Sequence, residues 1–134
     1  EYFAEYALIK YRVLVEVEYF FFLADQKFFK LPIKSRQALR SMLENFSVDN
    51  AYQIKQLESV TNHDVKAVEY FLKEQVEKAG IGHLKEWIHF GLTSQDINNT
   101  SVPLSVKEAL ADVYCPQVKE LIDIFNDFKK VSSL

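Results

Sequence analysis

Residues 61–73 read Thr-Asn-His-Asp-Val-Lys-Ala-Val-Glu-Tyr-Phe-Leu-Lys, a stretch that joins a helix-start signal to an apolar helical stripe. Apolar residues recur at intervals of three and four, which is typical of the buried face of an α-helix. Thr61 and Asp64 have the spacing of a capping box, so we predict that a helix begins after Thr61. Gly80 follows where a glycine commonly ends a helix. The predicted core face comprises Val65, Val68, Leu72 and Val76, with Glu69 and Lys73 as an ion pair on the outer face.

A capping box does not explain His63 or its neighbour Asn62. The free N–H groups and the positive end of the dipole make a helix start suitable for binding an anion. A histidine there can donate a hydrogen bond to a carboxylate or phosphate, and a neighbouring acid such as Asp64 can fix its charge or tautomer. Spacing alone therefore leaves two interpretations open, a structural cap and an anion-binding site.

A second polar helix start lies at residues 93–100, which read Thr-Ser-Gln-Asp-Ile-Asn-Asn-Thr. Thr93 and Asp96 again have capping-box spacing, and a cap is again the simpler interpretation. However, hydrogen-bonding side chains surround more than one helical turn, which is typical of a helix that lines a water-accessible site. Two such starts in one small domain suggest a shared anion-binding site. Its candidate residues are Asn62, His63, Asp64, Thr93 and Ser94, with Gln95, Asp96 and Asn99 as weaker candidates.

The predicted fold class is all-α, because only 3 Gly and 3 Pro occur in 134 residues and helical periodicity continues along the chain. We predict a long helix over residues 1–25, apolar around much of its circumference and buried on more than one side by a partner domain or subunit. Pro103 is expected to kink or interrupt the helix after Thr93, and Pro116 to lie in a first helical turn. The predicted apolar faces are Ala4, Leu8, Tyr11, Val15 and Phe22 in the first helix; Leu39, Met42, Leu43 and Phe46 in a helix capped by Ser35; Ala51, Ile54 and Leu57 in a helix capped by Ser47 or Asp49; Leu84, Trp87, Ile88 and Phe90 in a short segment over 81–91; and Val118, Leu121, Ile122, Phe125 and Phe128 in the last helix.

Composition and charge restrict the possible functions. The net charge is −3 with acids and bases interspersed, so there is no basic stripe of the kind that binds nucleic acid. Acidic residues interrupt the most apolar region, so no membrane span is predicted, and the first residues lack the basic region of a signal peptide. Cys115 is the single cysteine, which excludes an internal disulfide and fits a reducing cytoplasm. The sequence does not begin with methionine, so we expect it to start inside a longer gene product or to have been processed.

Other candidates for chemistry are weaker. His83 has only Glu86 at ligand spacing and His89 has no partner in the sequence, so neither indicates a metal site. Cys115 has no nearby histidine and is predicted to be a small core residue rather than a nucleophile. No glycine-rich phosphate loop is present. We therefore expect no metal and no cofactor.

The two polar motifs resemble those of the adenylosuccinate lyases, a family in the fumarase/aspartase superfamily. Residues 61–74, Thr-Asn-His-Asp-Val-Lys-Ala-Val-Glu-Tyr-Phe-Leu-Lys-Glu, are similar almost letter for letter to the bacterial form. Residues 88–99, Ile-His-Phe-Gly-Leu-Thr-Ser-Gln-Asp-Ile-Asn-Asn, resemble its second segment, and weaker similarity extends across the chain. The resemblance implies a single helical domain over residues 1–134. About residues 1–112 would be the N-terminal lyase domain, and about residues 113–134 the start of the first long bundle helix.

The resemblance also implies a function. Such an enzyme cleaves a C–N bond and releases fumarate from adenylosuccinate, giving AMP, and from succinylaminoimidazole carboxamide ribotide in purine biosynthesis. By position, Asn62, His63 and Asp64 would contact this small-molecule substrate, with His63 as a donor to its anionic groups. Thr93 and Ser94 would hold a succinyl carboxylate at their helix start. The intact enzyme would be a cytoplasmic homotetramer whose sites combine several subunits.

Several segments of that family are not found among the 134 residues. These are a serine-rich loop with Met-Pro-x-Lys-x-Asn that supplies the catalytic base, a Thr-His-Gly-Gln segment that supplies the acid, and an Asp-Gly-Arg-Tyr segment that binds phosphate. We therefore expect the chain alone to position substrate without catalysing the reaction. If residues 1–25 and 117–134 pack against absent segments, the isolated chain should self-associate or have mobile ends. A sister lyase, such as one acting on argininosuccinate, and a non-catalytic helical interaction module are the alternatives.

Overall fold

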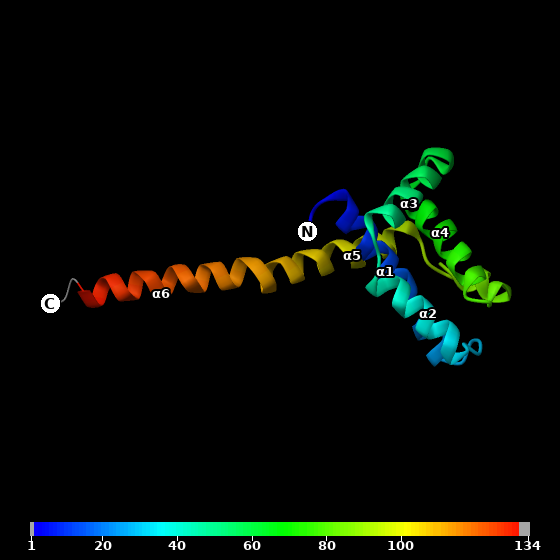
Figure 1. The fold of residues 1–134 in the computed structure, drawn as a ribbon, viewed down its shortest axis with the longest axis horizontal. Coiled ribbons are helices and arrows are strands. Elements are labelled where there is room, and N and C mark those ends of the chain that lie inside the picture. Colours follow the sequence, from blue (N-terminus) through cyan, green and yellow to red (C-terminus); the bar gives the residue numbers. More distant parts are fainter. Residues whose placement is uncertain (1, 132–134) are drawn as a thin grey trace.

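The described part of the chain is helical, as the composition and periodicity predict. The computed structural model describes residues 2–131, and no strand occurs among them. Figure 1 shows a group of packed helices from which the last helix projects far beyond the others. The elements are α1 (Glu5–Asp25), α2 (Ile33–Glu44), α3 (Val48–Thr61), α4 (Asp64–Lys78), a 3₁₀-helix η1 (Gly82–Trp87), α5 (Ser94–Ala109), a π-helix η2 (Leu110–Tyr114) and α6 (Cys115–Val131).

Helix α1 is the central helix and is buried on several sides, as its apolar circumference predicts. Helices α2, α3, α4 and α5 all pack against it, so this chain covers α1 without the predicted partner domain. The predicted face is wrong, since of its residues only Tyr11 is buried and Phe22 is 53% exposed. The sequence cannot single out one face because apolar residues occur on nearly every side of the helix. The buried residues are Ala7, Ile9, Tyr11, Arg12, Val13, Glu16, Val17, Phe20, Phe21 and Leu23.

Helix α2 begins earlier than predicted. Its N-cap is Pro32, whose fixed φ is already suited to a helix start, so the predicted cap at Ser35 is wrong. Ser35 lies inside the first turn, is buried, and donates a hydrogen bond to the carbonyl oxygen of Ala79 at 2.9 Å. It therefore ties α2 to the end of α4. The predicted core face is confirmed, with Leu39, Leu43 and Phe46 buried and Met42 packed against them.

Helices α3 and α4 meet at a tight turn that carries the first polar motif. Ser47 caps α3, because its hydroxyl accepts from the Asn50 N–H at 3.3 Å and Asn50 Oδ1 accepts from the Ser47 N–H at 2.9 Å. Helix α4 begins at Asp64 with His63 as its N-cap, so the predicted capping box of Thr61 with Asp64 is wrong. Thr61 is the last residue of α3, and its hydroxyl donates to the His63 carbonyl oxygen at 3.1 Å.

The apolar face of α4 agrees with the prediction. Its predicted end is also confirmed, with Gly80 in the left-handed region at φ 76°. Glu69 pairs with Lys73 as predicted, with Oε1 and Nζ 3.1 Å apart, but it is buried because α4 packs against several elements and has little free surface. Burial raises the pKa of Glu69, but hydrogen bonds from Lys66 and Lys73 outweigh this effect and lower that pKa. The buried residues of the predicted face are Val65, Val68, Leu72 and Val76.

The segment between α4 and α5 is compact. Leu84 and Ile88 are buried as predicted. Trp87 is half-buried, with its ring centroid 4.7 Å from that of Phe90. Phe90 itself is 49% exposed, so its predicted burial is wrong. Its ring packs on Trp87 at the surface and does not enter the core.

Helices α5 and α6 form one long rod with η2 between them (Figure 1). Helix α5 continues through Pro103 without a break, and the interruption that we predict there occurs instead at η2. Pro116 lies in the first turn of α6, as predicted. It has no N–H to donate to the carbonyl of Asp112 four residues earlier, which interrupts the α-helical hydrogen bonds where the π-helix lies.

Helix α6 carries an exposed apolar stripe of Val118, Leu121, Ile122, Phe125 and Phe128, whose exposed fractions range from 37% to 68%. Cys115 at its start is exposed, so its predicted core position is wrong, because the rod has left the packed helices at this point. Residues 132–134 of the predicted last helix lie outside the described residues. No helix in the described part of the chain is long and apolar enough to cross a membrane.

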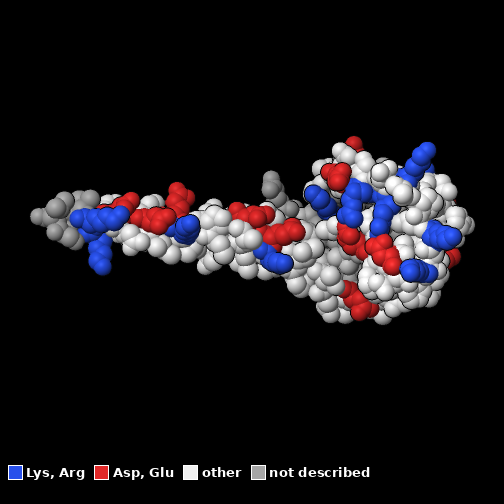
Figure 2. Space-filling view, turned by 90° about the horizontal axis from the view of Figure 1, so that it is seen from below, with Lys and Arg blue, Asp and Glu red and all other residues white. Residues whose placement is uncertain are grey.

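Charged side chains of both signs are interspersed over the packed helices and along α6 (Figure 2). Several of them form exposed ion pairs, such as Arg36 with Asp25 at 2.8 Å and Lys85 with Glu77 at 2.9 Å. Exposed pairs of this kind contribute only about 0–1 kcal/mol each. The stability of the fold therefore rests mainly on its apolar core.

Candidate functional site

The two polar helix starts lie next to each other in the structure. His63 is the N-cap of α4 and Ser94 is the first residue of α5. His63 Nε2 lies 3.4 Å from Ser94 Oγ, although the two residues are 31 positions apart in the sequence. The positive ends of two helix dipoles are therefore adjacent. The His63 side chain is 49% exposed, so this junction is open to a ligand.

His63 is arranged as a hydrogen-bond donor toward this junction. Its Nδ1 accepts a hydrogen bond from the Lys66 N–H at 3.2 Å. A ring nitrogen that accepts a hydrogen bond carries no proton, so in the neutral imidazole the proton is on Nε2. Nε2 is the atom that faces Ser94. Asp64 Oδ1 lies 3.5 Å from Nδ1 and accepts a hydrogen bond from the Val65 N–H at 2.7 Å.

Asn62 has a structural reason for its identity. It ends α3 in the left-handed region, with φ 50° and ψ 34°, a conformation that asparagine adopts more readily than most residues. Its N–H donates to the carbonyl oxygen of Glu58 at 2.8 Å. Its exposed side chain faces an open hollow of about 470 Å³, which is also lined by Lys55, Glu58, Ser59, His63 and Asp64.

Arg12 of α1 connects the two motifs, and sequence reasoning did not identify it. Its Nη2 lies 2.6 Å from Asp64 Oδ2, and its Nε donates to Asn98 Oδ1 at 2.9 Å. Arg12 is only 9% exposed, so its guanidinium lies between α1, α4 and α5. A planar guanidinium that holds two partners fixes their relative position. The feature of the sequence that could have indicated Arg12 is that it is the single arginine of the apolar α1.

The predicted capping box at the start of α5 is confirmed. The N–H and hydroxyl of Thr93 donate to Asp96 Oδ2 at 2.7 and 2.8 Å. These hydrogen bonds, from the backbone first and then the side chain, lower the pKa of Asp96. Gln95 Nε2 donates to Asn99 Oδ1 at 2.7 Å, so these two exposed side chains bond to each other. Ser94 is thus the hydroxyl of this motif that faces His63.

The lowered pKa of Asp96 predicts a pH-dependent contribution to stability. An acid whose pKa is lower in the folded state stabilises the fold above its ordinary pKa and loses that contribution as the pH falls through the folded value. We expect the free energy of unfolding to fall as the pH drops below about 4, the ordinary pKa of an aspartate, and to fall less steeply in Asp96→Asn. Urea unfolding at a series of pH values measures both slopes. Asp49→Asn, at an exposed acid on α3, is the control. Equal slopes in wild type and Asp96→Asn would contradict this assignment.

Part of the polar character of α5 reflects helix packing. Ser101 and Ser105 are buried, and α5 packs against α1. Their hydroxyls donate to carbonyl oxygens of their own helix, those of Asn98 at 3.5 Å and Val102 at 2.8 Å. Serine satisfies its hydroxyl in this way when it lies inside a helix. The polar residues in this part of α5 therefore lie on its packing face.

A buried carboxylate on α1 contacts His89, for which the sequence offers no partner. Glu16 is fully buried and its Oε1 contacts His89 Nδ1. Burial raises the pKa of Glu16, and the interaction with His89 partly offsets this effect. Its other oxygen, Oε2, has no hydrogen-bond partner among residues 2–131. The 73-residue separation of the pair explains why spacing rules do not detect it.

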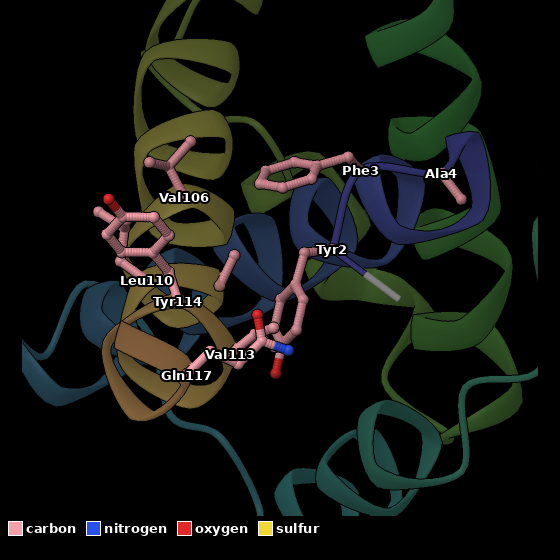
Figure 3. Close-up of a pocket in the computed structure, with 9 residues that line it drawn as sticks. Tyr2, Phe3, Ala4, Val106, Leu110, Val113, Tyr114 and Gln117 are labelled. Atoms are coloured by element: carbon pink, nitrogen blue, oxygen red, sulfur yellow. The ribbon is translucent and has the colours of Figure 1, made fainter. Parts of the chain in front are cut away.

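A second hollow lies where the N-terminal segment meets the rod. In Figure 3, Tyr2 and Phe3 extend from that segment toward Val106, Leu110 and Val113. The hollow has a volume of about 660 Å³ and no acidic, basic or histidine side chain lines it. Its polar lining groups are the hydroxyls of Tyr2 and Tyr114 and the amide of Gln117. In the described part of the chain, no group of three His, Cys, Asp or Glu side chains is arranged to hold a metal ion.

Comparison with known proteins agrees with the resemblance in the motifs. A family of lyases matches residues 26–131. The adenylosuccinate lyase of Dictyostelium discoideum is 49% identical over 130 residues, covering 91% of this chain and 28% of the relative. Those of Vibrio cholerae serotype O1 and Escherichia coli K12 are 44% and 45% identical, covering 90% and 93% of this chain. The chain spans 28% of the length of each of these curated relatives. Because the family match includes most of the sequence, and both motifs within it, the chain belongs to the lyase family.

Proposed function

We propose that this chain is the N-terminal, substrate-positioning part of a longer adenylosuccinate lyase. The longer enzyme would eliminate fumarate from adenylosuccinate, giving AMP, and from succinylaminoimidazole carboxamide ribotide in purine biosynthesis. The observation that carries the proposal is the junction of two helix starts, where His63 Nε2 lies 3.4 Å from Ser94 Oγ. Adenylosuccinate lyases that are 44–49% identical to the chain support this substrate class.

The junction suits an anionic ligand. Adenylosuccinate carries two succinyl carboxylates and a phosphate, and helix N-termini favour negative charge. His63 would donate from Nε2 to one of these groups, while Ser94, with Thr93 before it, would hold a succinyl carboxylate. Asn62 would contact the substrate from its turn. Asp64, paired with Arg12 at 2.6 Å, would contact the substrate from the start of α4, which this pair ties to α1.

The reaction also needs two proton transfers. A base removes a proton from the carbon beside a carboxylate, and the electron pair left on that carbon forms the double bond of fumarate. The C–N bond breaks, and an acid protonates the departing amine. Hydrogen-bond donors at the carboxylate stabilise the negative charge that develops there. We propose that this chain supplies such donors, and that segments outside the 134 residues supply the base and the acid.

The longer enzyme would act as a cytoplasmic homotetramer with sites shared between subunits. The half-exposed His63 supports a site that other segments complete. The exposed apolar stripe of α6 supports helix packing in such an assembly, because large exposed apolar patches commonly mark protein interfaces. The packed helices of residues 2–109 would then hold the substrate-binding junction beside the assembly.

Fumarate release measures this proposal directly. We expect the longer polypeptide to release fumarate from adenylosuccinate at about 1 s⁻¹ or more, an ordinary enzyme rate. The 134-residue chain alone should show no turnover. If neither protein releases fumarate but argininosuccinate protects the longer polypeptide against thermal unfolding, the result would indicate a sister lyase. If neither protein releases fumarate and neither substrate protects the longer polypeptide against unfolding, the result would indicate a non-catalytic module. Turnover by the 134-residue chain would contradict our placement of the base and acid.

A further inference from the structure

The buried carboxylate of Glu16 is a feature that the substrate-binding junction does not yet explain. A carboxylate that is removed from water destabilises the fold unless it is paired and hydrogen-bonded. Glu16 is 0% exposed, contacts His89 through Oε1, and leaves Oε2 without a partner among the described residues. A fold selected only for stability would gain from an apolar residue at this position.

The junction has two walls: the start of α4 with His63 is the first, and the start of α5 with Thr93 and Ser94 is the second. His89 belongs to the turn that leads into the second wall. The residue lies in the left-handed region at φ 61°, and Gly91 lies there at φ 72°. For a histidine this conformation is uncommon, and surrounding contacts must maintain it. The Leu92 N–H donates to the His89 carbonyl oxygen at 3.2 Å and closes the turn. Thr93 follows at once as the N-cap of α5.

Helix α1 holds this turn from one face. Residues 12, 16 and 19 are spaced by four and three positions, so they lie on the same side of the helix. Arg12 holds Asp64 at 2.6 Å and Asn98 at 2.9 Å. Glu16 holds the His89 ring, and Tyr19 donates its hydroxyl to the Phe90 carbonyl oxygen at 3.0 Å. One helix face thus contacts both walls of the junction.

We propose that Glu16 is a positioning residue for the second wall. Its buried carboxylate fixes the His89 ring, the ring keeps residues 88–92 in their left-handed turn, and the turn sets Ser94 against His63. The two walls then keep a fixed separation in the absence of ligand. The kinetic consequence rests on the proposed function, whereas the structural consequence does not.

The variant that tests the carboxyl group is Glu16→Gln, which keeps the shape of the side chain and replaces the carboxyl group by an amide. The matched control is Glu18→Gln, at an exposed acid of the same helix that pairs with Arg40. We expect Glu16→Gln to shift the backbone amide resonances of Thr93 and Ser94 and to weaken the nuclear Overhauser contact between the His63 ring and Ser94. Glu18→Gln should leave these signals unchanged. Unchanged signals in Glu16→Gln would overturn the proposal.

The kinetic test uses the longer polypeptide. We expect Glu16→Gln to raise the KM for adenylosuccinate about tenfold while kcat changes less than twofold, because a displaced binding wall weakens ground-state and transition-state binding alike. In a His89→Gln background, adding Glu16→Gln should change KM less than twofold, since Glu16 acts through His89. Additive effects in the double variant, or a purely kcat effect, would show that Glu16 does not position the wall.

Two further outcomes, an unfolded Glu16→Gln variant and an inactive wild-type polypeptide, each need another measurement. If Glu16→Gln does not fold, as judged by circular dichroism, His89→Gln replaces it, since this removes the ring through which Glu16 acts. It should shift the same Thr93 and Ser94 resonances, and unchanged resonances would overturn the proposal. If the wild-type polypeptide releases no fumarate, the proposed function fails. The resonance shifts then decide the role of Glu16 on their own.

Discussion

Replacing Ser94 with alanine should lower kcat/KM for fumarate release by the longer lyase about 10- to 100-fold. The change removes a single hydroxyl that lies 3.4 Å from His63 Nε2 at the start of α5. A hydrogen bond to a charged group contributes about 1.5–3 kcal/mol, and this range corresponds to the expected loss. The effect should be large because the proposed substrate presents a carboxylate that would otherwise have an unsatisfied charge at this wall.

The control for Ser94→Ala is Ser41→Ala, at an exposed serine of α2 that is away from both motifs. Steady-state kinetics should show Ser41→Ala within twofold of wild type. Thermal unfolding of both variants should match wild type, because the capping box of Thr93 and Asp96 is retained. A value of kcat/KM for Ser94→Ala within threefold of wild type would remove Ser94 from the substrate-binding wall.

Phe71→Ala should produce the largest loss of stability, about 3–5 kcal/mol. Phe71 is fully buried, and its ring packs edge-on against Phe46 with centroids 6.2 Å apart. Truncation removes buried apolar surface and leaves a cavity that rigid helices cannot fill. Domains of this size have a total stability of about 5–15 kcal/mol, so the variant should be close to unfolding.

Urea unfolding of the 134-residue chain measures this loss. Phe3→Ala is the matched control, because Phe3 is 73% exposed and the same truncation there should change stability by less than about 0.5 kcal/mol. A loss below about 1 kcal/mol for Phe71→Ala would mean that the α4 face does not form the centre of the core. The predicted packing of α4 would then be wrong.

The local parts of the site could be predicted from the sequence. The capping box of Thr93 and Asp96 depends on residues three positions apart, so spacing rules identify it. The similar spacing of Thr61 and Asp64 fails, because Asn62 turns the chain and makes His63 the cap. Two residues therefore changed roles through one left-handed backbone conformation. The sequence alone offers a cap or an anion site there, and does not choose between them.

The long-range contacts of the site could not be predicted from the sequence. Arg12 and Glu16 are separated by tens of residues from the partners they hold, and α1 is apolar on nearly every side. Periodicity therefore could not show which face meets α4 and α5. Pairwise packing of helices decides which polar side chains meet, and that depends on the whole core.

The sequence by itself determined that the chain is helical, that α4 buries its valine and leucine face, and that two polar helix starts occur. These properties depend on contacts within one or two helical turns, where residue spacing and propensity act directly. Only the tertiary structure decided that His63 and Ser94 meet and that α1 holds both walls. It also decided that the rod leaves the packed helices after α5. The reason is physical: burial against neighbouring helices selects one arrangement among many that the local pattern allows.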